Sequence, residues 1–259
     1  MKRWRPRILW IFAALVVACC IYLWSLSPQV AAVQLSRKIA RQSPYVHMVP
    51  LALPDSSVAT AAGTRLTYCG YVFEVPWNDL DEAKTTSPDR VVLHFRSGRT
   101  LILHSLPPRE FVNGIGNELT DMVRLTYGEK PLESDYDLQR LILESTPGKV
   151  SLFSSRKEAV GAPMLLTLKA VSAPEQSGLF SIQTKTFKGF QWGDPQKRPW
   201  KVIANLYAGD GSLEFIFARS KATELPSQSE INRVLQSATK STQVHSASML
   251  NPRPLPPII

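Results

Sequence analysis

The feature that most constrains this chain is a run of nineteen uncharged residues near its start, residues 8–26. As an α-helix this run would be about 28 Å long, close to the hydrocarbon thickness of a bilayer. Residues 1–7 contain four basic and no acidic side chains, and basic segments beside a membrane span stay in the cytoplasm. The sequence therefore predicts a cytoplasmic tail at residues 1–7, one transmembrane anchor at residues 8–26, and an exported remainder.

The apolar run also leaves open two alternatives to a retained anchor. A cleaved secretory signal would end in a small-residue cleavage site, and this run ends without a clear Ala-x-Ala pattern. A bacterial lipoprotein would be lipidated at Cys19 and turn polar after it, whereas residues 20–24 are apolar. We therefore expect that the anchor is retained.

Charge and cysteine content bear on the location and the partners of the exported part. The net charge is +9; four positive charges lie in residues 1–7, which leaves 9 − 4 = +5. This value suits an anionic lipid or an anionic envelope glycan, and we expect no nucleic acid partner. Cys69 is the only cysteine outside the anchor, so we expect no internal disulfide and a buried apolar role for its side chain. Because no Asn-x-Ser/Thr sequence occurs, we expect a bacterial inner (plasma) membrane protein with an extracytoplasmic domain.

The order of patterns along the chain predicts an α+β domain at residues 65–238, in which three to four helices pack on a mainly antiparallel sheet. Residues 27–64 are expected to form a linker, which has a weak helical pattern at residues 29–42 and becomes proline-rich afterwards. Residues 239–259 form a proline-rich tail, which we expect to be disordered.

Strands are predicted where aromatic and β-branched residues lie between turn signals: residues 66–75, 90–96, 99–104, 150–153, 179–187, 190–192, 201–207 and 212–218. Helices are predicted from apolar spacing and capping residues: residues 108–127, 134–146, 155–171 and 227–238. A polar connection is expected at residues 77–89. The predicted core includes Leu93, Phe95, Leu141, Phe215 and Phe217.

Two histidines near one hairpin suggest a metal site. If the hairpin turns evenly at Ser97-Gly98, Phe95 faces Thr100, and His94 and His104 then point to opposite faces of the sheet. In that register they share no ion, whereas a three-residue turn would place them on one face. We therefore predict no metal site and no cofactor.

Motifs for covalent catalysis are weak in this sequence. Ser154 and Lys157 match a Ser-x-x-Lys pattern, as do Ser237 and Lys240, but the companion Ser-Asp-Asn and Lys-Thr-Gly elements are absent. Helix capping accounts for these serines better. We assign no catalytic residue.

A candidate binding patch lies between residues 185 and 201, which hold five basic residues and one acidic residue. Aromatic rings beside cations can contact lipid, sugars or a protein partner. The alternative is that the aromatic residues belong to the core. The patch consists of Lys185, Phe187, Lys188, Phe190, Trp192, Lys197, Arg198, Trp200 and Lys201.

These observations favour a membrane-anchored extracytoplasmic domain that binds or scaffolds another envelope component. An envelope protein, an anionic lipid or a glycan are the partners that we expect. The alternatives are an envelope hydrolase of unfamiliar type, because catalytic sites assemble from distant residues, and a structural subunit of a membrane complex.

Overall fold

A computed structural model of the chain describes residues 15–21, 27–172, 178–219 and 224–241. Its main feature is a seven-stranded antiparallel sheet with the strand order β3-β4-β5-β9-β8-β7-β6. In chain order these strands are β3 (Leu80–Ser87), β4 (Arg90–Phe95), β5 (Arg99–Leu106), β6 (Leu179–Gln183), β7 (Lys188–Trp192), β8 (Lys201–Ala208) and β9 (Gly211–Arg219). The predicted α+β class with a large antiparallel sheet is confirmed.

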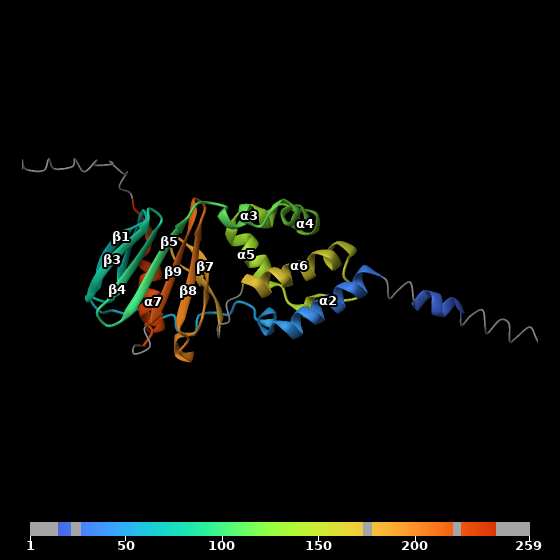
Figure 1. Cartoon of the computed structure of the whole chain (residues 1–259), viewed down its shortest axis with the longest axis horizontal. Coiled ribbons are helices and arrows are strands. Elements are labelled where there is room, and N and C mark those ends of the chain that lie inside the picture. The colour runs from blue at the N-terminus through green and yellow to red at the C-terminus, as the bar shows by residue number, and fades with distance from the viewer. Residues whose placement is uncertain (1–14, 22–26, 173–177, 220–223, 242–259) are drawn as a thin grey trace, which may run out of the picture.

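A second, three-stranded sheet has the order β1-β2-β10. Its strands are β1 (Thr64–Tyr68), β2 (Tyr71–Val75) and β10 (Thr239–Lys240). The helices are α2 (Pro28–Gln42), α3 (Glu110–Gly114), α4 (Asn117–Tyr127), α5 (Asp135–Glu144), α6 (Arg156–Ser172) and α7 (Gln228–Ser237). Short 3-10 helices lie at η1 (Pro44–His47), η2 (Lys130–Leu132), η3 (Pro147–Lys149) and η4 (Pro195–Lys197). Figure 1 shows both sheets and α7 at one end of the molecule, and α2 to α6 at the other.

The main core lies between one face of the large sheet, here called the inner face, and α7 with the small sheet. Alternating apolar residues of β4, β5, β8 and β9 point to this face, as the period of two in a strand requires. Of the predicted core residues, Leu93, Phe95, Phe215 and Phe217 are buried, and Leu141 is half-buried.

The opposite, outer face of the large sheet meets the helices over β6, β7 and β8. Leu143 of α5 packs there with Phe190 and Trp192. Further from the sheet, α2 lies along α6, and the two helices share a cluster that includes Ile39 and Leu166.

The predicted strand at residues 66–75 is a tight hairpin of β1 and β2. Cys69 and Gly70 form its turn with φ angles of 53° and 77°, and two left-handed residues match the twist of a two-residue hairpin. The Cys69 thiol is free and half-buried, and burial raises its pKa to about 11. The polar residues 80–87, predicted as a connection, form the edge strand β3, whose free edge and exposed faces account for its composition.

Three predicted elements differ in extent from the prediction. The single helix at residues 108–127 is divided into α3 and α4, because Gly116 adopts a φ of 82° that an α-helix does not allow. Residues 150–153, predicted as a strand, form a turn. The strand predicted to end at Phe187 ends at Gln183, and the next residues turn back into β7.

The predicted register of the β4–β5 hairpin is wrong by one residue. His94 lies opposite Thr100, and Arg90 lies opposite His104, because three residues, 96–98, form the turn. His94 and His104 therefore share the outer face, about 13 Å apart along the strands. In the described part of the chain, no group of three His, Cys, Asp or Glu residues is placed to hold a metal ion.

The predicted membrane segment is described only in part. No helix among the described residues is long and apolar enough to cross a bilayer. Residues 15–21 of the predicted anchor are helical. The rest of it, residues 8–14 and 22–26, lies outside the described residues. Residues 239–240 of the predicted disordered tail form β10, which pairs with β2, and the tail beyond residue 241 lies outside the described residues.

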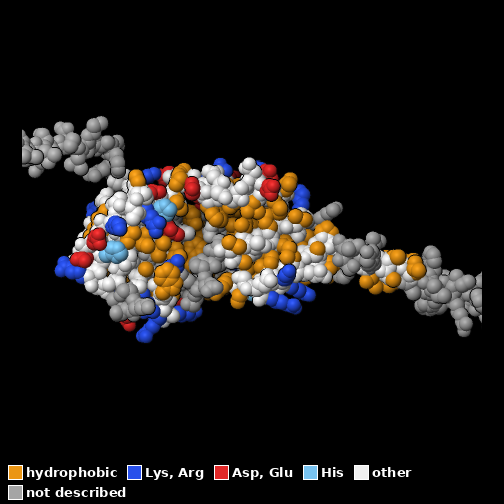
Figure 2. Space-filling view, viewed as in Figure 1, with side chains coloured by type: hydrophobic (Ala, Val, Ile, Leu, Met, Phe, Trp, Pro, Cys, Tyr) orange, Lys and Arg blue, Asp and Glu red, His pale blue; other side chains and the backbone are white. Residues whose placement is uncertain are grey.

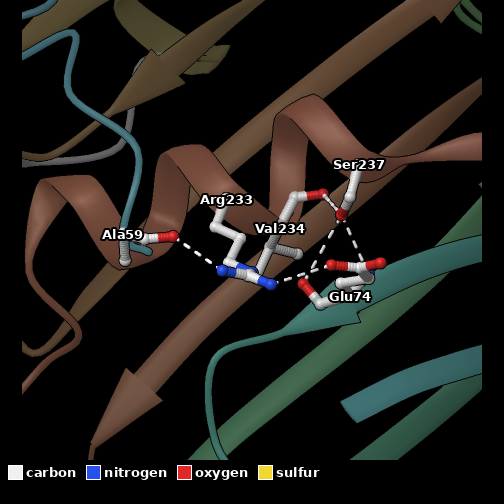
Figure 3. Close-up of polar contacts among 5 residues, drawn as sticks. All are labelled: Ala59, Glu74, Arg233, Val234 and Ser237. Carbon is white, nitrogen blue, oxygen red and sulfur yellow. Dashed lines mark hydrogen bonds and ion pairs between the residues drawn. The ribbon is translucent and has the colours of Figure 1, made fainter. Parts of the chain in front are cut away.

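The predicted linker is held against the domain by hydrogen bonds. The Leu51 N–H donates to the Leu179 carbonyl at 3.0 Å, and the Ser181 N–H donates to the Leu51 carbonyl at 2.8 Å, so this segment covers the β6 edge. At the other end of the linker, Arg233 of α7 donates to the Ala59 carbonyl at 2.8 Å and to the Glu74 carboxylate at 3.0 Å (Figure 3). The Ser237 hydroxyl accepts from the Glu74 N–H at 2.8 Å in the same network.

A buried lysine joins three parts of the helical layer. Lys169 of α6 is fully buried. Its Nζ donates to the carbonyl oxygens of Met48, Leu143 and Ser145 at 2.5, 2.7 and 2.7 Å. Each N–H of the ammonium group therefore has an acceptor, which offsets much of the cost of burying it.

Candidate functional site

The structure divides the predicted binding patch. Lys185 and Lys188 lie at the β6–β7 turn, and Lys197, Arg198, Trp200 and Lys201 lie around η4. These two groups flank the five residues of β7, a length of about 17 Å. Phe187, Phe190 and Trp192 are buried, whereas Trp200 is 62% exposed. The Lys201 Nζ lies 4.4 Å from the centroid of the Trp200 ring.

A cavity of about 210 Å³, with a mainly apolar lining that includes several polar side chains, lies between the outer face of the sheet and the helices α3 and α5. We call it the sheet–helix cleft. Figure 2 shows apolar side chains gathered over the seam where the sheet meets the helices. The cleft is lined by Leu106, Phe111, Asp135, Gln139, Trp192, Ile203, Asn205, Tyr207, Ser212, Leu213 and Glu214.

Strand pairing places the polar side chains of the cleft on one face. Asn205 of β8 lies opposite Glu214 of β9, and Tyr207 lies opposite Ser212. Their sequence neighbours Leu206, Leu213 and Phe215 point to the inner core. These two strands thus supply a polar wall on one side and a core wall on the other.

The helical wall is built around Asp135, which is buried. Ser134 caps α5 by accepting from the Asp137 N–H at 3.1 Å, and this places Asp135 in the first turn. The Asp135 Oδ1 accepts from the Val112 N–H of α3 at 2.9 Å. One carboxylate oxygen therefore holds α3 against α5 while the residue lines the cleft.

The cleft is acidic. It is lined by two carboxylates, Asp135 and Glu214, and no lysine or arginine of the described chain lines it. Burial raises the pKa of Tyr207, and a hydrogen bond from Asn205 lowers it in part. The negative charges of Asp135 and Glu214 raise this pKa further. Tyr207 therefore keeps its phenolic proton at neutral pH and can donate it in a hydrogen bond.

Two polar atoms of cleft residues have no protein partner. The Trp192 Nε1 and the Asn205 Oδ1 are buried without a hydrogen bond to any described residue. Leaving such a group unpaired costs about 1–3 kcal/mol, and buried polar groups in proteins are nearly always paired with protein, water or ligand. Both residues line the cleft, but the two atoms themselves are shielded from it, so a polar ligand would reach them only after a side-chain movement.

A second hollow, lined by three basic and three acidic side chains, adjoins the cleft at Asp135 and Tyr207, which line both. Lys188 of the predicted patch lines this hollow together with Arg109 and Arg140. The Lys188 Nζ lies 6.0 Å and the Arg140 Cζ 5.8 Å from the centroid of the Tyr136 ring. Only Lys188 and Trp192 of the predicted patch therefore line either of these two cavities.

Sequence reasoning missed most of the cleft. The residues at 205, 207, 212 and 214 carry the alternation of a strand with one buried face, which normally indicates a solvent-exposed second face. Asp135 sits in the first turn of a predicted helix, where the helix dipole already accounts for a carboxylate. Trp192 was the one cleft residue within the predicted patch.

The cleft lacks the usual parts of a nucleophilic site. Among the described residues that line it, none is a histidine or a cysteine. His104 lies beside it, with the Nδ1 3.9 Å from the Glu214 carboxylate and the Nε2 3.6 Å from that of Asp89. Ser212 therefore has no basic partner in the cleft itself.

Comparison with known proteins adds no assignment, because no protein-family model, curated protein sequence or solved structure matches this chain.

Proposed function

We propose that this chain is a membrane-tethered binding protein whose sheet–helix cleft takes a small polar ligand. The observation that carries this proposal is a cavity lined by two carboxylates, Asp135 and Glu214, and by two residues, Trp192 and Asn205, that each have a buried polar atom without a protein partner. In the same proposal, residues 8–26 anchor the chain in a bacterial inner membrane, and the domain is extracytoplasmic.

The chemistry of the cleft favours a small amine that also carries a hydroxyl or carbonyl oxygen. Asp135 and Glu214 attract a positive group, and the Trp192 indole can only donate, so it suits an oxygen of the ligand. A volume of about 210 Å³ is below the range of roughly 300–1,000 Å³ for drug-sized ligands. The ligand is therefore compact.

We expect small amines to stabilise the protein, and Glu214→Gln to weaken their binding by about tenfold or more, because the loss of a charge-assisted contact costs at least about 1.4 kcal/mol. The measurement is the thermal shift of the full chain in mild detergent with ethanolamine, glucosamine or arginine. Glu82→Gln, on the exposed strand β3, is the control and should bind as the wild type does. Equal shifts for wild type and Glu214→Gln would contradict the assignment.

An envelope hydrolase is the alternative that one observation favours. Asp135 and Glu214 line the cleft from opposite walls, one helical and one on the sheet, and paired carboxylates perform glycoside hydrolysis. For a hydrolase, Asp135→Asn and Glu214→Gln would each abolish turnover of a glycan while the glycan still binds. For a binding protein, no turnover occurs and both substitutions weaken binding.

The exposed part of the predicted patch offers a second contact. Lys197, Arg198, Trp200 and Lys201 present cations around an exposed aromatic ring. We propose that this surface meets an anionic lipid, an anionic glycan or an envelope protein.

The proposed topology predicts that protease added outside spheroplasts digests the domain, because the basic tail holds the N-terminus in the cytoplasm. Immunoblotting of the domain before and after detergent permeabilisation measures this. Protection of the domain in intact spheroplasts would reverse the topology. A mature protein that begins at Cys19 or later would show that the segment is processed.

A further inference from the structure

We propose that the end of the helical layer that carries Phe153 rests on the membrane, with the Phe153 ring inserted among phospholipid headgroups. This proposal rests on the proposed tether and adds a second contact with the same bilayer.

Phe153 is 98% exposed, the highest value among the large apolar side chains of the described residues. Hydrogen bonds order the turn that presents it. The Phe153 N–H donates to the Ser151 hydroxyl at 3.2 Å, and the Ser151 N–H donates to the Ser154 hydroxyl at 3.0 Å. The next residue, Ser155, caps α6 by accepting from the Glu158 N–H at 3.2 Å. The ring thus projects from a defined turn, and moving it out of water is favourable.

This turn lies at the end of the body where the chain arrives from residues 8–26. The last turn of α6 is next to the segment after α2, because Lys169 donates to the Met48 carbonyl. The two helices pack along each other, so their N-terminal ends lie together at the opposite end (Figure 1). α2 begins at Pro28, capped by Ser27, and Phe153 precedes α6 by three residues.

The chain leaves little distance between the anchor and this end. If all of residues 8–26 span the bilayer, the span is followed directly by Ser27, the first residue of the body. If the span ended earlier, at residue 21, the five residues 22–26 would still separate it from Ser27 by at most about 17 Å when fully extended. The N-terminal ends of α2 and α6 are therefore held at the bilayer surface.

The surroundings of Phe153 fit a phospholipid surface. Leu152 is 38% exposed and Val160 51%. Leu125 of α4 is 70% exposed, and α4 reaches this region because Thr126 lies against Gly161 of α6. Apolar side chains at this depth partition into the headgroup boundary.

Basic residues of α2 lie away from the end that meets the bilayer. Arg37, Lys38 and Arg41 are exposed, but they follow Pro28 by nine or more residues, about 14–20 Å along the helix. The entry of the anchor and the exposed apolar side chains therefore favour lipid over a protein partner.

The test uses the full chain with one nitroxide label, reconstituted in vesicles of phosphatidylethanolamine and phosphatidylglycerol. Cys19→Ala, Cys20→Ala and Cys69→Asn remove the native thiols, asparagine being chosen because it tolerates the positive φ of residue 69. Phe153→Cys carries the label. Lys84→Cys on β3, at the far end of the molecule (Figure 1), carries the control label.

We expect the label at residue 153 to collide with a water-soluble nickel chelate about twofold less often than the label at residue 84, and with oxygen more often. Equal nickel accessibility in a chain that resists alkaline carbonate extraction would overturn the contact and leave the tether intact. Extraction of the chain by carbonate would overturn both. Shielding from oxygen and nickel alike, increasing with protein density in the vesicles, would show that a second copy covers Phe153 and would overturn the lipid contact.

Discussion

Replacing Lys169 with methionine is expected to lower the free energy of unfolding by about 3 kcal/mol. The Lys169 Nζ donates to three carbonyls, those of Met48, Leu143 and Ser145. Methionine fills a similar volume but donates nothing, and each carbonyl left unpaired inside the protein costs about 1–3 kcal/mol. The Met48 and Ser145 carbonyls are part-buried, so water can replace the lysine there. We therefore expect a loss of stability at the lower end of the range obtained by summing the three costs.

Denaturant unfolding of the full chain in mild detergent, followed by circular dichroism, measures this loss. Lys157→Met is the matched control, because Lys157 is exposed on the same helix, and we expect its effect to stay within about 0.5 kcal/mol. If the two variants unfold alike, Lys169 does not hold the helical layer together.

The pH dependence of stability provides an independent check on Lys169. Burial, with a smaller contribution from Lys149, lowers the pKa of Lys169 from 10.5 to about 8. Between these values the unfolded chain keeps a proton that the folded chain has released, so the wild type gains stability as the pH rises from about 8 to 10.5. Below pH 8 the cost of burying the charge is fully present. Lys169→Met should lack this gain, and an unchanged stability difference across this pH range would show that the three carbonyls hold the pKa near 10.5.

Gly189→Ala is expected to destabilise the protein by about 3 kcal/mol and to disturb the sheet–helix cleft. A Cβ at residue 189 would lie 2.0 Å from the Asn205 carbonyl oxygen. That oxygen belongs to the backbone of β8, which pairs directly with β7, so one strand must move. Overpacking of this kind costs about 1–3 kcal/mol, occasionally more. Because the Asn205 side chain lines the cleft, the movement should also weaken amine binding.

The measurements are thermal unfolding and the ligand-induced thermal shift. Gly209→Ala is the control, because an added Cβ at residue 209 meets nothing within 4 Å. We expect Gly209→Ala to retain both stability and ligand response. A Gly189→Ala variant with unchanged melting and binding would mean that the β7–β8 pairing is looser than described.

Local chemistry made several elements predictable. The helix starts at Ser134, Ser155 and Ser227 are confirmed: in each, the serine hydroxyl accepts a backbone N–H three residues on. Such caps act within one turn of helix, so the sequence alone contains the information. The strands predicted at residues 90–96, 99–104, 201–207 and 212–218 are confirmed as β4, β5, β8 and β9, because aromatic and β-branched residues between turn signals are also local information.

Errors arose where one backbone angle decided the outcome. The turns at Cys69-Gly70 and Gly116 depend on positive φ values of 53°, 77° and 82°, and neither position differs from its neighbours in apolar pattern. The β4–β5 turn has three residues rather than two, which moved His104 from one face of the sheet to the other relative to His94. A shift of one residue is enough, because the side-chain period of a strand is two.

The sequence by itself determined the α+β class, the antiparallel strands of the sheet and the faces that enter its core, because apolar patterning and capping act over a few residues. Only the tertiary structure decided which polar residues meet. The cleft joins Asp135 of α5, Trp192 of β7 and Glu214 of β9, which lie far apart in sequence and show no common spacing. The tertiary structure also separated the residues of 185–201 from one another. The basic residues lie at the two ends of β7, and most of the aromatic residues lie in the core. Composition cannot reveal such a division, because the path of the chain through the sheet decides which residues share a surface.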